Sequence, residues 1–195
     1  MAEQIIDGTG TGKRTKVDST NHLAVRSITE AESLEGAIDG NQYIVTSGGM
    51  ALTSATASAV LYFENNEEFP LILNRIIFGA AVSTGGTTNV CAVSVTVNPT
   101  GLGSGSGNPA VGINSNFGSS NTLTLTSSEI GQEAATVTGG SAGPTFFFPD
   151  KLTSTFPSEI VLPKGSSIAI SVTPPASNSS LVVAASINVH KFIED

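Results

Sequence analysis

Residues 89 to 98 read NVCAVSVTVN, and this stretch decides the fold class. Val93, Val95 and Val97 alternate with the small residues Ala92, Ser94 and Thr96. Such a period of two is typical of a strand with one buried face, whereas a helix would bring apolar residues together at intervals of three and four. The segment therefore predicts a β-strand in a sheet that covers a core.

Upstream of this strand, two further segments have the composition of strands. Residues 57–63 (ASAVLYF) and 71–82 (LILNRIIFGAAV) are apolar and partly β-branched. The polar residues 64–68 (ENNEE) between them predict a hairpin with a solvated tip. A calcium site is less favoured, because these residues lack the ligand spacing and the glycine of a calcium loop.

Downstream, the alternation returns three times. Residues 122–126 (TLTLT) repeat it briefly, and residues 181–193 are long enough for a final strand. Residues 159–162 and 167–173 flank a Pro-Lys-Gly turn, which predicts a second hairpin.

The whole sequence of 195 residues fits one all-β domain with a core of its own. It contains 21 glycines, and only 12% of its residues are charged, which disfavours a helical bundle. Many short strands with turns between them indicate a sandwich or a barrel, and the sandwich is favoured. We therefore expect a β-sandwich over residues 41–195, preceded by an extended amino-terminal arm over residues 1–40.

Charge and hydropathy exclude some classes of partner. The net charge of −8 disfavours general nucleic-acid binding, which depends on clustered Lys and Arg. The most apolar window, residues 71–82, is too short for a membrane span and contains Asn74 and Arg75. The first residues lack the basic flank and apolar core of a secretory signal, so we expect synthesis in a cytoplasm.

Residues with catalytic or ligand-binding chemistry do not form a known pattern. Residues 8–13 (GTGTGK) resemble a phosphate loop, but Asp7 stands at the first glycine position and Arg14 follows the lysine. His22 and His190 lie far apart, and the single cysteine, Cys91, lies in the middle of a strand. We expect no enzyme activity, no cofactor and no metal.

Two features are candidates for subunit contacts. Residues 76–128 carry no ionisable charge except the thiol of Cys91, so they form either solvated loops or a surface that packs on copies of the protein. Phe146, Phe147 and Phe148 are consecutive aromatics, which belong either to the core and a loop or to an anchor for another subunit.

The first forty residues contain a series of short segments with a familiar arrangement: IIDGTG at 5–10, KVD at 16–18, HLAVR at 22–26, TE at 29–30 and GNQY at 40–43. This series resembles the amino-terminal region of tailed-bacteriophage virion proteins. The rest of the chain is similar in architecture to the jelly-roll body of head decoration, or cement, proteins and of some tail components. The resemblance implies a structural protein without catalytic residues.

For this chain, the resemblance implies a homotrimer that binds the major capsid protein on the capsid surface of the virion. The arm has apolar residues that short strand-like pieces cannot bury alone, and basic residues that suit an acidic partner. Alternatively, the arm folds back onto its own body. The candidate partner-binding residues of the arm are Ile5, Ile6, Lys13, Arg14, Lys16, Leu23, Val25 and Arg26.

Two alternative functions remain open. The first is a phage tail or baseplate component with the same arm and body. The second is a carbohydrate-binding jelly-roll module, although sugar sites usually stack rings on Trp or Tyr, and this chain has no Trp and only Tyr43 and Tyr62.

Overall fold

The computed structural model describes residues 37–53, 55–82, 90–103, 107–149, 153–175 and 181–191. The chain divides after Ala31, and every described residue belongs to the second unit, Glu32–Asp195. Within the described residues, no helix has the length and hydrophobicity of a membrane span.

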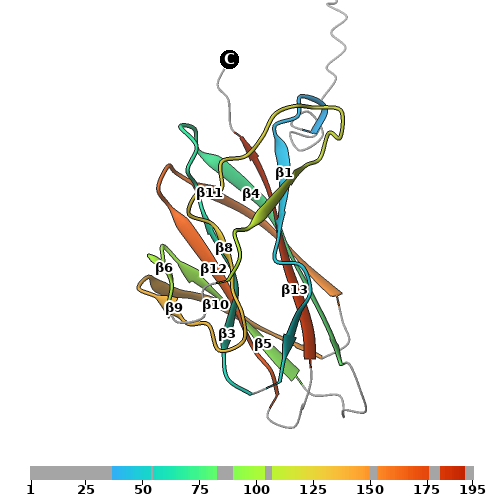
Figure 1. Cartoon of the computed structure of the whole chain (residues 1–195), viewed down its shortest axis with the longest axis vertical. Helices are drawn as coiled ribbons and strands as arrows, with labels where there is room; N and C mark the ends of the chain where they lie inside the picture. Colours follow the sequence, from blue (N-terminus) through green and yellow to red (C-terminus); the bar gives the residue numbers. More distant parts are fainter. Residues whose placement is uncertain are drawn as a thin grey trace, which may run out of the picture. The chain divides into compact units, whose positions relative to one another are not determined.

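The described strands form two main antiparallel sheets and one short pair (Figure 1). The six-stranded sheet has the order β11-β4-β13-β1-β7, and β2 pairs with β13 beside this path. Its strands are β1 (Gln42–Thr46), β2 (Met50–Leu52), β4 (Leu71–Val82), β7 (Val111–Asn114), β11 (Thr153–Leu162) and β13 (Leu181–Lys191).

The five-stranded sheet has the order β10-β5-β12-β3-β8, and β6 pairs with β9 separately. The strands of this sheet are β3 (Ser58–Glu64), β5 (Val90–Val97), β8 (Glu129–Ile130), β10 (Ser141–Pro149) and β12 (Ser167–Thr173). The separate pair consists of β6 (Gly101–Leu102) and β9 (Val137–Thr138).

The connectivity is that of a jelly roll. Eight strands, β1, β3, β4, β5, β10, β11, β12 and β13, form the halves β1-β13-β4-β11 and β3-β12-β5-β10. Among these eight, successive strands change sheet at every step except from β5 to β10, which pair with each other. The predicted all-β, jelly-roll-like sandwich is confirmed.

The core lies between the two sheets and follows the alternation of the sequence. On β5, Cys91, Val93 and Val95 point inward and are buried, together with Val60 and Phe63 of β3. On the opposite sheet, the buried side chains of β4 and β13 complete the core: Leu71, Leu73, Ile76, Phe78, Leu181, Val183, Ala185, Ile187 and Val189.

Both predicted hairpins are wrong. The turn after β3 leads to β4 in the other sheet, and the turn after β11 leads to β12 in the other sheet. A strand-like sequence does not show which strand it pairs with, because pairing depends on contacts across the whole sandwich. A polar turn between two strands therefore fits a crossing between sheets as well as it fits a hairpin.

Asn65 joins these two crossings. Its Nδ2 donates hydrogen bonds to the carbonyl oxygens of Phe69 (3.0 Å) and Leu162 (2.7 Å), and its Oδ1 accepts one from the amide of Glu67 (2.9 Å). The main chain of Asn65 also exchanges hydrogen bonds with Gly165 and Ser166 in the other turn. Asn65 is fully buried, and its hydrogen bonds connect the turn after β3 to the turn after β11.

The strand predicted at residues 122–126 is also wrong. This stretch is a loop in which Leu123 and Leu125 are partly buried against the core. The leucines cover Gly112 of β7, where a Cβ atom would lie 3.0 Å from a Cδ1 atom of Leu125. The alternating leucines therefore belong to a loop that packs on a glycine. The amide of Thr124, which lies between them, donates its hydrogen bond to the carboxylate of Glu67 and not to a neighbouring strand.

Candidate functional site

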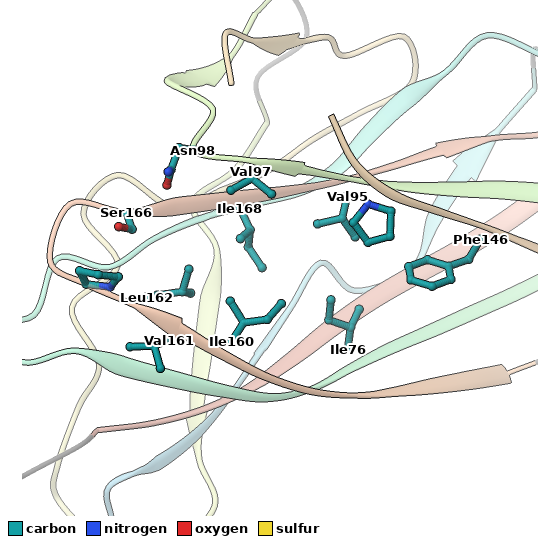
Figure 2. A pocket seen from close by; sticks show the side chains of 12 residues that line it. Ile76, Val95, Val97, Asn98, Phe146, Ile160, Val161, Leu162, Ser166 and Ile168 are labelled. Atoms are coloured by element: carbon teal, nitrogen blue, oxygen red, sulfur yellow. The ribbon is translucent and has the colours of Figure 1, made fainter. Parts of the chain in front are cut away.

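An apolar pocket lies where the two sheets separate at one side of the sandwich. Its walls come from β10 and β11, which are the end strands of their sheets, and from β4, β5 and β12 behind them. In Figure 2, Val95, Val97 and Ile168 face Ile76, Ile160 and Val161 across the opening. The pocket has a volume of about 330 Å³, and Asn98 and Ser166 are the polar residues of its lining.

The edge strands at this pocket are irregular. The pairing of β10 with β5 shifts register between Ala142 and Thr145, and the pairing of β11 with β4 shifts between Pro157 and Ile160. Pro144 and Pro157 lie at these shifts and have no amide hydrogen to donate to an added strand. An added strand could therefore pair only with the regular parts of β10 and β11 on either side of these prolines.

A second candidate surface lies at the end of the sandwich where the described chain begins. Here the loop after β7 presents Phe117, which is 92% exposed, and Ile38 beside it is also exposed. Asn116 holds the two together, because its Nδ2 donates to the carbonyl of Ile38 at 2.8 Å and its Oδ1 accepts from the amide of Gly118 at 3.0 Å. Figure 1 shows the first described residues alongside this loop.

The later part of the same loop is held to the sandwich by hydrogen bonds to an ion pair between Glu67 and Lys191. Nζ of Lys191 lies 3.1 Å from Oε2 of Glu67, and both side chains are largely buried. The amide of Thr124 donates to Glu67 at 2.7 Å, and Nζ of Lys191 lies 5.4 Å from the centre of the Tyr43 ring. The predicted solvated tip at residues 64–68 is therefore wrong for Glu67, although Glu68 is exposed.

These contacts shift the acid–base behaviour of Glu67 and Tyr43. Burial by itself raises the pKa of Glu67, but hydrogen bonds from Thr124 and the charge of Lys191 outweigh it and hold the pKa below its ordinary value. Burial raises the pKa of Tyr43, and the nearby Lys191 only partly opposes this effect.

We expect Glu67→Gln to lower the free energy of unfolding by about 1 to 2 kcal/mol at pH 7, because it removes the charge that Lys191 faces in a largely buried place. A carboxyl group whose pKa falls on folding stabilises the protein above its unfolded pKa of about 4.3, and this contribution is lost as the pH falls through the folded value. The difference between the two proteins should therefore shrink towards pH 3. Urea unfolding at several pH values measures it, and an equal difference at every pH would contradict the assignment.

The three candidate phenylalanines have different positions. Phe146 is partly buried against the core and lines the pocket, so it is mainly a core residue. Phe147 points outward and is 70% exposed, which leaves it available for a subunit contact. Phe148 is placed in β10 opposite Cys91, and its side chain lies outside the described part of the molecule.

The other candidate residues are either outside the described residues or buried. His22 and the candidate partner-binding residues of the arm, Ile5 to Arg26, precede the first described residue, Ala37. Cys91 and His190 are buried on separate sheets. Within the described ranges, no group of three His, Cys, Asp or Glu side chains could hold a metal ion.

Sequence reasoning missed the pocket and Phe117. The pocket combines residues from five strands, so no local pattern could show it. Phe117 had a weak signal, because it is an isolated aromatic within the polar sequence Asn114-Ser115-Asn116, which is typical of a solvated loop.

The fold and these surfaces define a jelly-roll β-sandwich with an apolar opening at one edge and an exposed aromatic loop at one end. Comparison with protein-family models finds none that matches the chain. Comparison with curated proteins finds no match either.

Proposed function

We propose that the protein is a non-enzymatic structural component of a tailed-bacteriophage virion, which binds the outside of the capsid as a decoration protein. The proposal combines the resemblance of the first forty residues with the jelly-roll fold. Its partner is the major capsid protein, and it assembles as a homotrimer.

The observation that carries the proposal is the exposed apolar end of the sandwich. An aromatic side chain that is 92% exposed gains no stability from the fold, yet Asn116 orders the loop that presents it. Ordered aromatic residues are frequent anchors in protein interfaces. Because Ile38 lies beside Phe117 and residues 1–36 precede it directly, the loop and the arm can contact one partner together.

The outer face of the six-stranded sheet supports self-association. Thr46, Ser186 and Ile77 are neighbours in register across β1, β13 and β4, and Ile44 lies opposite Ile113 of β7 on the same face. None of these side chains is charged, although the exposed Arg75 lies on the same face in register with Asn188 and Ile44, so a second copy could pack without desolvating ions only on the part of the face beyond Arg75.

The tyrosines give little support to a carbohydrate-binding module. Tyr43 and Tyr62 are only 1% and 3% exposed, so neither ring is free to stack on a sugar. Exposed stacking surfaces among the described aromatics come from phenylalanines such as Phe147.

The test is co-sedimentation of the purified full-length protein with expanded empty heads and, separately, with tails. We expect binding to heads, and we expect Phe117→Ser to weaken it at least tenfold, because the variant loses an aromatic anchor that attachment would bury, worth about 2 kcal/mol. The matched control is Val182→Ser, which changes an exposed residue at the far end of β13. Light scattering of the same samples gives the oligomeric mass.

Binding to tails but not to heads would favour the tail or baseplate alternative. If Phe117→Ser and Val182→Ser both bind heads as well as the unchanged protein does, the loop is not part of the attachment surface.

A further inference from the structure

We infer that the apolar pocket between β10 and β11 binds a neutral, straight-chain amphiphile, such as a medium-chain aliphatic alcohol, with its hydroxyl group at Asn98 and Ser166. This inference concerns the free protein and does not depend on attachment to a capsid. It rests on the position of the polar groups in the pocket, on the length and volume of the pocket, and on the charge around it.

The polar groups of the pocket lie at one end. Figure 2 shows Asn98 and Ser166 beside each other at the end away from Phe146. The amide of Asn98 donates to the carbonyl of Ser167 at 2.8 Å, and the amide of Ser167 donates back to Oδ1 of Asn98 at 3.3 Å. These bonds orient the side chain of Asn98, so its amide group and the hydroxyl of Ser166 can exchange hydrogen bonds with a hydroxyl group of a ligand.

The apolar part of the pocket is elongated. Two rows of aliphatic side chains face each other along it in Figure 2, with Val97, Ile168 and Val95 in one row and Val161, Ile160 and Ile76 in the other. Phe146, at the apolar end, pairs with Val93 of β5. Val93 and Val97 lie four residues, or roughly 13 Å, apart along this strand. An extended hydrocarbon chain suits such a shape, because both rows can contact it along its length.

The volume of the pocket sets the length of the hydrocarbon chain. An engineered apolar cavity of about 150 Å³ holds benzene, which has six non-hydrogen atoms. The pocket has a volume of about 330 Å³ and so has room for about twice as many atoms, close to the eleven of decan-1-ol. Ligand pockets in proteins typically have volumes from about 300 Å³ upwards, with apolar walls and a small number of polar groups. The pocket therefore has the size and composition of a ligand site.

Charge around the pocket favours a neutral head group. The described lining has no charged side chain. Lys164, in the turn that supplies Pro163 to the lining, already pairs with Glu68 at 2.6 Å. The net charge of −8 repels an anion from the protein as a whole. A carboxylate at Asn98 and Ser166 would therefore lose water without gaining a cation from the described lining.

A ligand can enter the pocket from the side of the sandwich. β10 and β11 belong to different sheets, so no ladder of main-chain hydrogen bonds closes the opening between them. The rim residues Val97, Ile160 and Val161 are exposed to solvent. A hydrocarbon chain between the two rows would remove this apolar surface from water, which is the driving force for binding.

The test is calorimetric titration of the full-length protein with hexan-1-ol, octan-1-ol, decan-1-ol and dodecan-1-ol, each below its solubility limit. Every CH₂ group that enters the pocket should strengthen binding about fourfold. We expect this gain to continue up to decan-1-ol and to stop at dodecan-1-ol, because the pocket is then full. A gain that continues undiminished to dodecan-1-ol would overturn the inference, since it would indicate adsorption on an open apolar surface.

Variants and a charged analogue test the position and the head group. Ile160→Trp fills the pocket and should weaken binding of decan-1-ol at least tenfold, whereas the matched control Val182→Trp, at an exposed position on β13, should leave it unchanged. Ser166→Ala should weaken binding several-fold without changing the dependence on chain length. Decanoate should bind at least tenfold more weakly than decan-1-ol at pH 7. Circular dichroism confirms that each variant is folded.

Three results would overturn the inference. Absence of binding for all four alcohols would exclude a ligand of this class. Equal binding of decan-1-ol to Ile160→Trp and to Val182→Trp would place the alcohol outside the pocket. Binding of decanoate as tight as that of decan-1-ol would exclude selection for a neutral head group. All of these measurements use the free protein, so failure of this inference and failure of the proposed function can be distinguished.

Discussion

Replacing Asn65 with alanine is expected to lower the free energy of unfolding by roughly 3 to 5 kcal/mol. The substitution removes the amide that binds the carbonyls of Phe69 and Leu162 and the oxygen that accepts from Glu67. All three main-chain groups then lose this partner in a buried or partly buried place, and each group left unsatisfied costs about 1 to 3 kcal/mol.

Urea unfolding followed by circular dichroism measures this effect as a lower midpoint with an unchanged slope. The matched control is Asn121→Ala, because Asn121 is exposed and its side chain donates only a long hydrogen bond of 3.4 Å to the carbonyl of Asp39. We expect that control to change stability by less than about 0.5 kcal/mol. A loss of under 1 kcal/mol for Asn65→Ala would show that water replaces the side chain and that the crossings do not depend on it.

Deleting residues 1–36 is expected to abolish attachment to heads while the sandwich remains folded. The deletion ends before Ala37, because the next residues bond to the body: Asn114 donates to the carbonyl of Gly40 at 2.9 Å, and Asn116 donates to that of Ile38. A longer deletion to residue 40 would remove these acceptors and confound stability with binding. The core residues all lie after residue 42, so the shorter deletion should cost little stability.

The physical reason for the loss is that the arm supplies the apolar residues Ile5, Ile6, Leu23 and Val25 and four of the eight basic residues of the chain. Ordering a segment costs about 1 to 2 kcal/mol per residue, which offsets much of the free energy gained when these apolar residues are buried. Because the balance is close, the attraction between the basic residues of the arm and an acidic partner should decide whether the arm binds. Lys13→Glu, Arg14→Glu and Lys16→Glu together should weaken it with the fold intact. If the truncated protein co-sediments like the full chain, the attachment surface lies on the sandwich alone.

Several of the long strands could be predicted from the sequence, because their residues are apolar and β-branched or alternate between apolar and small types. Residues 57–63 and 89–98 correspond closely to β3 and β5. Sheet membership could not be predicted, since the residues that flank the turns at Asn65 and Gly165 would look the same in a hairpin. The buried Asn65 distinguishes the two cases only when both crossings are seen together.

The candidate surfaces were even harder to predict from the sequence, because they form only in the tertiary structure. The pocket consists of ordinary core residues, such as Ile76 and Ile168, at a place where two edge strands diverge. Phe146 and Phe147 are neighbours in sequence with the same side chain, yet the pleat of β10 turns one to the core and the other to solvent. A run of aromatics thus indicates a strand with two apolar faces, and only the structure shows which residue is accessible.

The prolines at the edges of the sandwich have a consequence for storage at high concentration. A jelly roll leaves the backbone of its outer strands unsatisfied, and in a crowded solution such strands can add to one another and grow into fibres. Pro144 and Pro157 interrupt the two long edges, and on the other side β7 and β8 are only four and two residues long. The protein should therefore remain dispersed at concentrations where an uninterrupted β-sandwich would form amyloid.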